Sequence, residues 1–175
     1  MTHYVVDAAH STVGFTVRHA GIGKTRGHFG EFEGTIDLPH DNSVEGASTQ
    51  GTIQAASVNT NNNDRDNHLR SADFFDVEKF PTWDFESTGT SGSLEDFKLH
   101  GDLTIHGVTQ PVVLDVSFEG AATDPFGVER IAFEATTTIR RKDFGLTWNA
   151  VMEAGGVLVS DKINISLEIE ATKAE

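Results

Sequence analysis

Hydrophobic and polar residues alternate along most of this chain, as they do in β-strands that bury one face. Near the C-terminus, for example, Ile163, Ile165 and Leu167 are separated by polar residues. The short connection 106–109 predicts a tight hairpin between two of the strongest runs. In all, the alternation predicts eight strands, at residues 12–19, 31–38, 49–55, 83–86, 97–106, 112–119, 133–139 and 163–171.

Two segments break the alternation. Residues 61–71 are polar, with asparagines suited to an N-cap, acidic residues in the first turn and basic residues in the last. This order predicts one short helix, followed by an apolar anchor that includes Phe74 and Phe75. Residues 142–160 form a long late loop whose apolar content predicts that it packs down as a lid.

Eight strands, each with one apolar face, predict a single closed antiparallel barrel with its polar face outward and no exposed edge. A barrel of this size is either filled by its own side chains or holds one small ligand. Inward positions alternate between small residues, such as Gly51, Gly101 and Ala135, and large aromatic residues, which leaves room for an elongated apolar ligand. A filled core or a two-sheet sandwich fits the same periodicity. The length of 175 residues predicts one domain, residues 1–175.

Charge and composition narrow the function classes. Lysine plus arginine number 13 and aspartate plus glutamate number 27, giving a net charge of −14. Such an acidic chain disfavours nucleic-acid binding and general adhesion to anionic membranes. The absence of cysteine excludes disulfides, thiolate metal sites and thiol catalysis. No apolar run is long enough for a transmembrane helix. No secretory signal is evident, so we expect a cytoplasmic protein, or a periplasmic one if a signal was removed.

Candidate catalytic motifs are weak. The eight histidines include no local metal-ligand spacing, so we expect neither a metal nor a cofactor, although a site assembled from distant strands stays open. His10 and Ser11 are sequence neighbours and would point to opposite faces of a strand, which argues against a nucleophile–base pair. The stretch 21–25 lacks the spacer of a phosphate-binding loop. We therefore expect no enzyme activity and assign no catalytic residue.

Several stretches resemble the YceI-like family, and they occur in order over nearly the whole chain. They are DAAHSTVGFTVRH at 7–19, DRDNHL at 64–69, DFFD at 73–76, FP at 80–81, GDLTIHGVT at 101–109, RRKDFGL at 140–146 and SDKI at 160–163. The resemblance implies a lipocalin-like eight-stranded barrel whose cavity binds polyisoprenoid chains or similar long-chain amphiphiles. Many relatives are periplasmic with a cleaved signal, and the sequence departs from them in that respect.

The barrel hypothesis assigns residues to the ligand. Polar side chains near a mouth of the barrel, on the short helix or in the basic cluster 140–143 are candidates to bind a ligand's head group. They are His19, Arg65, His68 and Arg140. Each has an ordinary alternative role, in internal hydrogen bonds or on a solvated face. The residues expected to line the cavity are Phe15, Val17, Phe32, Ile53, Phe75, Phe85, Leu103, Ile105, Val116, Phe133, Phe144, Trp148 and Ile165.

The sequence thus predicts binding, transport or sequestration of a long apolar molecule. Two alternatives stay open: a barrel enzyme that acts on a lipid-like substrate with His19 or His68 as base, and a filled-core interaction module. Val113 and other apolar residues on the polar faces of the strands leave room for a homodimer.

Overall fold

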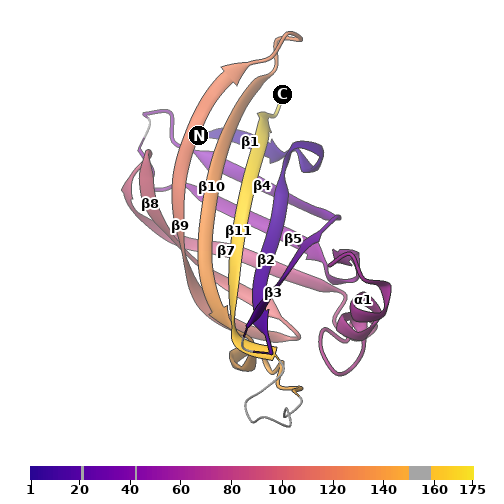
Figure 1. Ribbon diagram of the computed structural model, residues 1–175. Coiled ribbons are helices and arrows are strands. Elements are labelled where there is room, and N and C mark those ends of the chain that lie inside the picture. Colours follow the sequence, from indigo (N-terminus) through magenta and orange to yellow (C-terminus); the bar gives the residue numbers. More distant parts are fainter. Residues whose placement is uncertain (21, 42, 150–158) are drawn as a thin grey trace.

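The protein is described by a computed structural model covering residues 1–20, 22–41, 43–149 and 159–175 (Figure 1). Nearly all regular structure is strand, with one α-helix, α1 (Asn63–Arg70), and three short 3-10 turns, η1 (Ala8–His10), η2 (Ala55–Ser57) and η3 (Arg141–Phe144). The strands are β1 (Thr2–Val6), β2 (Thr12–His19), β3 (Gly23–Phe29), β4 (Phe32–Leu38), β5 (Ser48–Gln54), β6 (Val58–Asn59), β7 (Thr82–Ser93), β8 (Asp96–Ile105), β9 (Val108–Thr123), β10 (Glu129–Arg140) and β11 (Val159–Lys173).

The sheet closes on itself as an eight-stranded antiparallel barrel. Neighbouring strands pair in the order β1, β4, β5, β7, β8, β9, β10 and β11, and β11 returns to β1 through pairs such as Val6 with Ala171. In Figure 1, β9, β10, β11 and β2 run side by side in front, while β4, β5 and β7 cross behind them. The predicted fold class is confirmed. Closure pairs the edges that an open sheet would expose.

The first two predicted strands are present as β2 and β4, and each is accompanied by a strand that the sequence did not predict, β1 or β3. β1 and β2 both pair with β11 and are separated by η1, whereas β3 and β4 form the returning strand beside them. The predicted runs 12–19 and 31–38 agree with β2 and β4 to within one residue, but they leave out β1 and β3. Segment 23–29 was missed because its alternate positions are Gly23, Thr25 and Gly27, which give no hydrophobic period. Segment 2–6 was missed because Tyr4, Val5 and Val6 are apolar without interruption and show no alternation.

The short helix lies where the sequence predicts it. Asn62 caps it, since its side chain accepts the Arg65 N–H at 3.0 Å. Asp66 is buried and accepts both the Thr60 N–H at 2.9 Å and the Thr60 hydroxyl at 2.5 Å. These bonds fix the helix to the chain that leaves β6. The apolar anchor that follows it packs into the core, where Phe75 contacts Trp83 edge to face.

Turns also follow the sequence. The β8–β9 hairpin has two loop residues, His106 at φ 56° and Gly107 at φ 72°. Two positive φ angles are the geometry that matches the twist of paired strands, and glycine adopts it without strain.

An ion-pair network around Arg130 ties the far ends of β10 and β11 to the β1–β2 bend. Its guanidinium donates to Asp7 at 2.8 Å and to Asp124 at 2.9 Å, and lies 3.4 Å from Glu170. Hydrogen bonds from Arg130 and His10 hold the pKa of Asp7 below its usual 3.8. Backbone hydrogen bonds from the turn and the Arg130 side chain lower the pKa of Asp124 in the same direction.

This network predicts how acid affects stability. Because both carboxyls have lowered pKa values in the folded protein, their contribution is present above 3.8 and is lost as the pH falls through the folded values. Arg130→Met should lower the melting temperature at neutral pH, and the gap to wild type should narrow below about pH 4. Thermal unfolding followed at several pH values measures this difference in melting temperature. Lys98→Met, which removes an exposed pair with Asp115, is the control. A gap that does not change with pH would contradict the role of Asp7 and Asp124.

Candidate ligand-binding cavity

The barrel encloses an elongated cavity of about 290 Å³. This volume lies near the lower end of the range for small-molecule sites, which is roughly 300–1,000 Å³. Its lining includes members of both hydrophobic clusters of the core: Val13, Phe29 and Ile105 belong to one, and Phe97 and Val116 to the other. The cavity therefore extends from one cluster to the other through the lumen.

Eleven of the thirteen residues that the sequence places in the lining border this cavity, since they face inward from eight different strands and from the chain that follows α1. They are Phe15, Val17, Phe32, Ile53, Phe75, Phe85, Leu103, Ile105, Val116, Phe133 and Ile165. The ten that lie on strands share one signal, the period-two phase, which fixes the face of a strand on which a side chain lies. Trp83 and Leu99 also line the cavity, and the same phase could have identified them.

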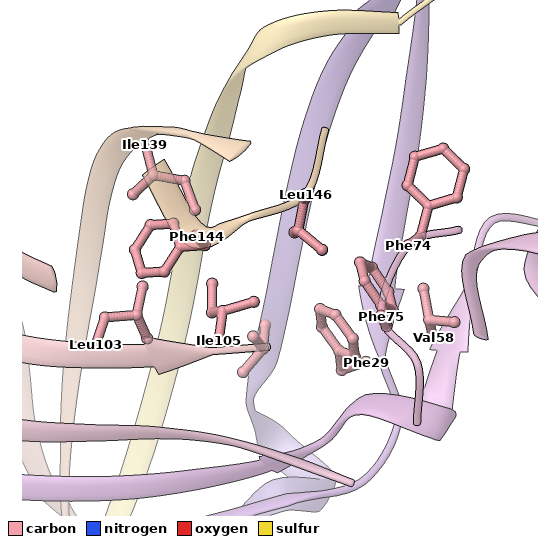
Figure 2. Packing of buried hydrophobic residues seen from close by; sticks show 10 residues of the cluster. Phe29, Val58, Phe74, Phe75, Leu103, Ile105, Ile139, Phe144 and Leu146 are labelled. Carbon is pink, nitrogen blue, oxygen red and sulfur yellow. The ribbon is translucent and has the colours of Figure 1, made fainter. Parts of the chain in front are cut away.

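Phe144 and Trp148 do not border the cavity, although the sequence placed them there. Phe144 is only 1% exposed and lies among Ile139, Leu103 and Ile105, where it closes the core beneath η3 (Figure 2). Trp148 stacks edge to face on His68, with ring centroids 4.7 Å apart. Both therefore pack the segment 144–149 against the barrel. The predicted lid extends to residue 160, and its part at 150–158 lies outside the described residues.

Two aromatic rings lie flat against the barrel wall, which helps to keep the lumen open. The Phe85 ring covers Gly101, and the Phe15 ring covers its cross-strand partner Gly27. A Cβ at either glycine would collide with the ring that covers it. Because these glycines have no side chain, each ring can lie across the neighbouring strand instead of projecting into the lumen.

The glycine contacts lead to a stability prediction. In Gly101→Ala, the new methyl group would meet the Phe85 ring and the Glu86 carbonyl oxygen at 2.8 Å, so the ring must swing into the lumen. We expect a loss of about 1–3 kcal/mol in unfolding free energy, as for other overpacked sites. Gly89→Ala is the matched control, because nothing lies within 4 Å of a Cβ there. Urea unfolding of both variants measures the difference, and equal losses would contradict the packing described.

Arg141 is a charged residue in this otherwise mainly apolar lining. It is 6% exposed, and its guanidinium donates to four backbone carbonyls. The acceptors are Leu146 at 3.0 Å, Trp148 at 2.7 Å, Val159 at 3.2 Å and Ser160 at 3.0 Å. Burial lowers the pKa of the guanidinium, and the charge of Asp161 partly opposes that shift. Arg141 thus joins the start of β11 to the segment after η3, and its side chain borders the lumen.

The four predicted head-group residues lie outside the lining. Arg140 is on the outer face, 3.6 Å from Asp161. Arg65 donates to the Thr60 carbonyl oxygen at 2.6 Å, and His68 lies 2.9 Å from Asp73. His19 shares the inward phase of β2, but its ring lies on Gly23 beside a bulge in the β2–β11 pairing. For Arg65, His68 and Arg140 these contacts are of the kind that the sequence left as alternatives, whereas the buried His19 Nδ1 atom has no hydrogen-bond partner among the described residues. The roles of the four toward a ligand stay predictions.

The described residues offer no group of three or more His, Cys, Asp or Glu side chains that could hold a metal ion. Ser11, next to His10 in sequence, donates its hydroxyl to the backbone carbonyls of Asp7 and Glu170, at 2.7 and 3.2 Å. Within the same described part of the chain, no helix has the length and hydrophobicity to cross a bilayer.

Comparison with known proteins places this cavity in a family context. The family model described as YceI-like domain matches residues 4–171. A UPF0312 protein of Vibrio cholerae is 38% identical over 149 residues, which cover 82% of this chain and 77% of that protein. A UPF0312 protein of Staphylococcus aureus is 33% identical over 176 residues that cover 100% of both chains.

Solved structures agree in fold. A YceI protein of Campylobacter jejuni is 35% identical, with a TM-score of 0.78 over 90% of each chain. BcnA of Burkholderia cenocepacia has a TM-score of 0.82 at 22% identity, covering 95% of this chain and 99% of its own. A polyisoprenoid binding domain of Saccharophagus degradans has a TM-score of 0.74 at 16% identity, covering 99% and 100%. At the last two identities the likeness concerns the fold alone.

Proposed function

Because this chain belongs to the YceI-like family, we propose that its barrel binds a long apolar or amphiphilic molecule, such as a polyisoprenoid chain, inside the cavity. The observation that carries the proposal is the largely apolar lining, which extends between the two core clusters. The Saccharophagus neighbour is a polyisoprenoid binding domain, which supports this ligand class. Binding would serve the transport or sequestration of a molecule that is poorly soluble in water.

The lining accounts for affinity without any polar contact along the chain of the ligand. Each methylene-sized group moved from water into the lumen contributes about 0.8 kcal/mol, and part of the sum offsets the ordering of a flexible chain. The eleven inward residues named above would make these contacts. Since the cavity holds about 290 Å³, affinity should rise with chain length only until the lumen is full.

We assign the polar end of the ligand to Arg141. Its side chain borders the cavity, and its hydrogen bonds go to carbonyls and not to a carboxylate. A buried guanidinium without a bonded carboxylate favours an oxygen-rich or anionic head group. The neighbouring Arg140 is directed outward and already faces Asp161.

Binding without a chemical step fits the contacts better than the two alternatives. The enzymatic alternative needs His19 or His68 as base, and neither of them borders the cavity in which a lipid-like substrate would lie. A filled-core interaction module would lack the cavity between the clusters.

Mass spectrometry tests the proposal directly. The protein is purified without detergent and measured under native conditions, before and after organic extraction. We expect a stoichiometric apolar species that extraction removes, and its mass would identify the ligand class. Bare protein that also fails to take up added polyprenyl or fatty-acyl compounds would overturn the proposal.

A further inference from the structure

The fold gathers basic side chains at one end of an acidic barrel. The pairings of β3 with β2, β2 with β11 and β11 with β10 bring four strands together there, at the lower end of Figure 1. Six exposed residues on these strands and on η3 form what we call the basic rim: Arg18, Lys24, Arg26, Arg140, Lys142 and Lys162. The rim holds nearly half of the 13 lysine and arginine residues of the chain.

Most of the rim charge is not neutralised by the protein. Within the described part of the chain, Asp161 is the rim's only ion-pair partner, at 3.6 Å from Arg140 and 3.8 Å from Lys142. Arg18 lies directly opposite Lys24, and Arg140 directly opposite Lys162. Like charges that lie directly opposite each other destabilise a sheet. Their presence here favours the binding of an anion from outside the protein.

Cations elsewhere on the barrel behave differently. Lys98 pairs with Asp115, Lys173 lies 3.0 Å from Glu129, and Arg130 contacts three carboxylates. The charges of these three residues are thus matched by carboxylates of the protein, whereas the rim presents most of its charge to the surroundings.

An exposed apolar residue stands at the tip of the same end. Ile22, in the turn between β2 and β3, is 90% exposed and lies between Arg18 and Lys24 in sequence. Phe126 is comparably exposed at 91%, but it belongs to the β9–β10 turn at the opposite end of the barrel (Figure 1). An aliphatic tip flanked by basic residues is the combination that inserts into the interface of an anionic bilayer.

The rim and the charged end of the cavity are built from the same strands. Val17, Ile139 and Ile163 line the cavity, and each is the sequence neighbour of a rim residue. Arg141 also lines the cavity, between Arg140 and Lys142. A surface that engages the rim would therefore lie next to the Arg141 end of the lumen.

We propose that the basic rim and Ile22 dock this barrel on an anionic phospholipid bilayer, with the Arg141 end of the cavity toward the membrane. Docking there lets an apolar ligand pass between bilayer and lumen, and this second step rests on the proposed function. The net charge of −14 does not prevent contact. The 15-residue strand β11 is about 50 Å long, whereas charges are screened beyond about 8 Å at physiological ionic strength, so distant carboxylates have little effect at the rim.

Vesicle co-sedimentation tests docking with the full chain. Phosphatidylcholine vesicles with and without phosphatidylglycerol are compared at low and high salt. Wild type should sediment with the anionic vesicles only, and high salt should release it.

The triple variant Arg18→Glu/Lys24→Glu/Arg26→Glu should lower the partitioning of the protein to anionic vesicles at least about tenfold. The matched control Lys79→Glu/Lys98→Glu/Lys173→Glu changes net charge equally and should bind as wild type does. Ile22→Ser should weaken binding, and Phe126→Ser should not.

The outcomes separate docking from ligand binding. Uptake of a short-chain prenol from solution, without vesicles, should be unchanged in the Arg18/Lys24/Arg26 variant. If wild type binds anionic vesicles but takes up no prenol, docking stands and the proposed function fails. If wild type ignores both vesicle types, or if the control triple variant loses as much binding as the rim variant, docking is overturned and an acidic protein becomes the better partner for the rim.

Discussion

Ala135→Phe is expected to lower uptake of an apolar ligand by at least tenfold while the barrel stays folded. Ala135 lines the cavity, and in the sheet it lies between Val116 on β9 and Leu167 on β11. Leu167 packs against both core clusters, so a ring at position 135 would occupy the lumen near their junction. Filling empty apolar space should leave stability unchanged or raise it by about 1 kcal/mol. Titration with a fluorescent fatty-acyl or polyprenyl probe measures uptake.

The neighbouring position offers a matched control. Thr136 is exposed on the outer face of the same strand, so Thr136→Phe adds the same ring without entering the lumen. Uptake by Thr136→Phe should equal that of wild type. If Ala135→Phe bound the probe as well as wild type does, the ligand would not occupy the lumen.

Arg141→Met should cost about 3 kcal/mol of unfolding free energy, because the four carbonyl oxygens that accept from its guanidinium would be left unpaired in a buried site. For a chain of this length, that loss lowers the melting temperature by roughly 6–12 °C. Arg141→Lys keeps the charge, but one ammonium cannot reach all four acceptors, so its loss should be intermediate. Urea unfolding followed by tryptophan fluorescence is the measurement.

Two comparisons make this prediction specific. Arg140→Met removes an exposed cation beside Asp161 and should cost less than about 1 kcal/mol. In ligand binding, wild type should prefer a prenyl phosphate over the corresponding alcohol, and Arg141→Lys should retain that preference. Equal losses of unfolding free energy in Arg140→Met and Arg141→Met would show that the hydrogen bonds of Arg141 to the carbonyl oxygens do not account for the loss. A variant without charge at 141 that kept the preference would remove Arg141 from the head-group site.

The strand assignments illustrate how far periodicity reaches. Residues 97–106 and 163–171 were recognised because most of their inward side chains are large and apolar, and the structure has strands at both places. Residues 23–29 carry glycine or threonine at three inward positions, and Phe29 at the end is the one large apolar residue there. The Phe15 and His19 rings of the neighbouring strand lie on Gly27 and Gly23. Much of the side-chain cover on this strand therefore comes from another strand, so the segment itself shows no hydrophobic period.

The cavity residues divide in a similar way. The inward phase of the strands identified ten of the residues that border the cavity, and the same phase, counted on from Ile139, assigns Arg141 to the lumen and Arg140 to the outer face. The basic cluster 140–143 led to the prediction that Arg140 binds the head group. The charge of a residue does not show on which face of the strand its side chain lies. Phe144 and Trp148 were misplaced because η3 ends the strand phase and turns the following chain over the core.

By itself, the sequence determined that the chain forms strands, which face of most strands is apolar, where the helix and hairpins lie, and that the family is YceI-like. These properties depend on side-chain order within a few residues, so local physical chemistry is enough to specify them. Only the tertiary structure decided that the lumen is hollow, that Arg141 faces it, and that the basic residues gather at one end. Each of these depends on which distant strands become neighbours when the barrel closes, and no local pattern contains that information.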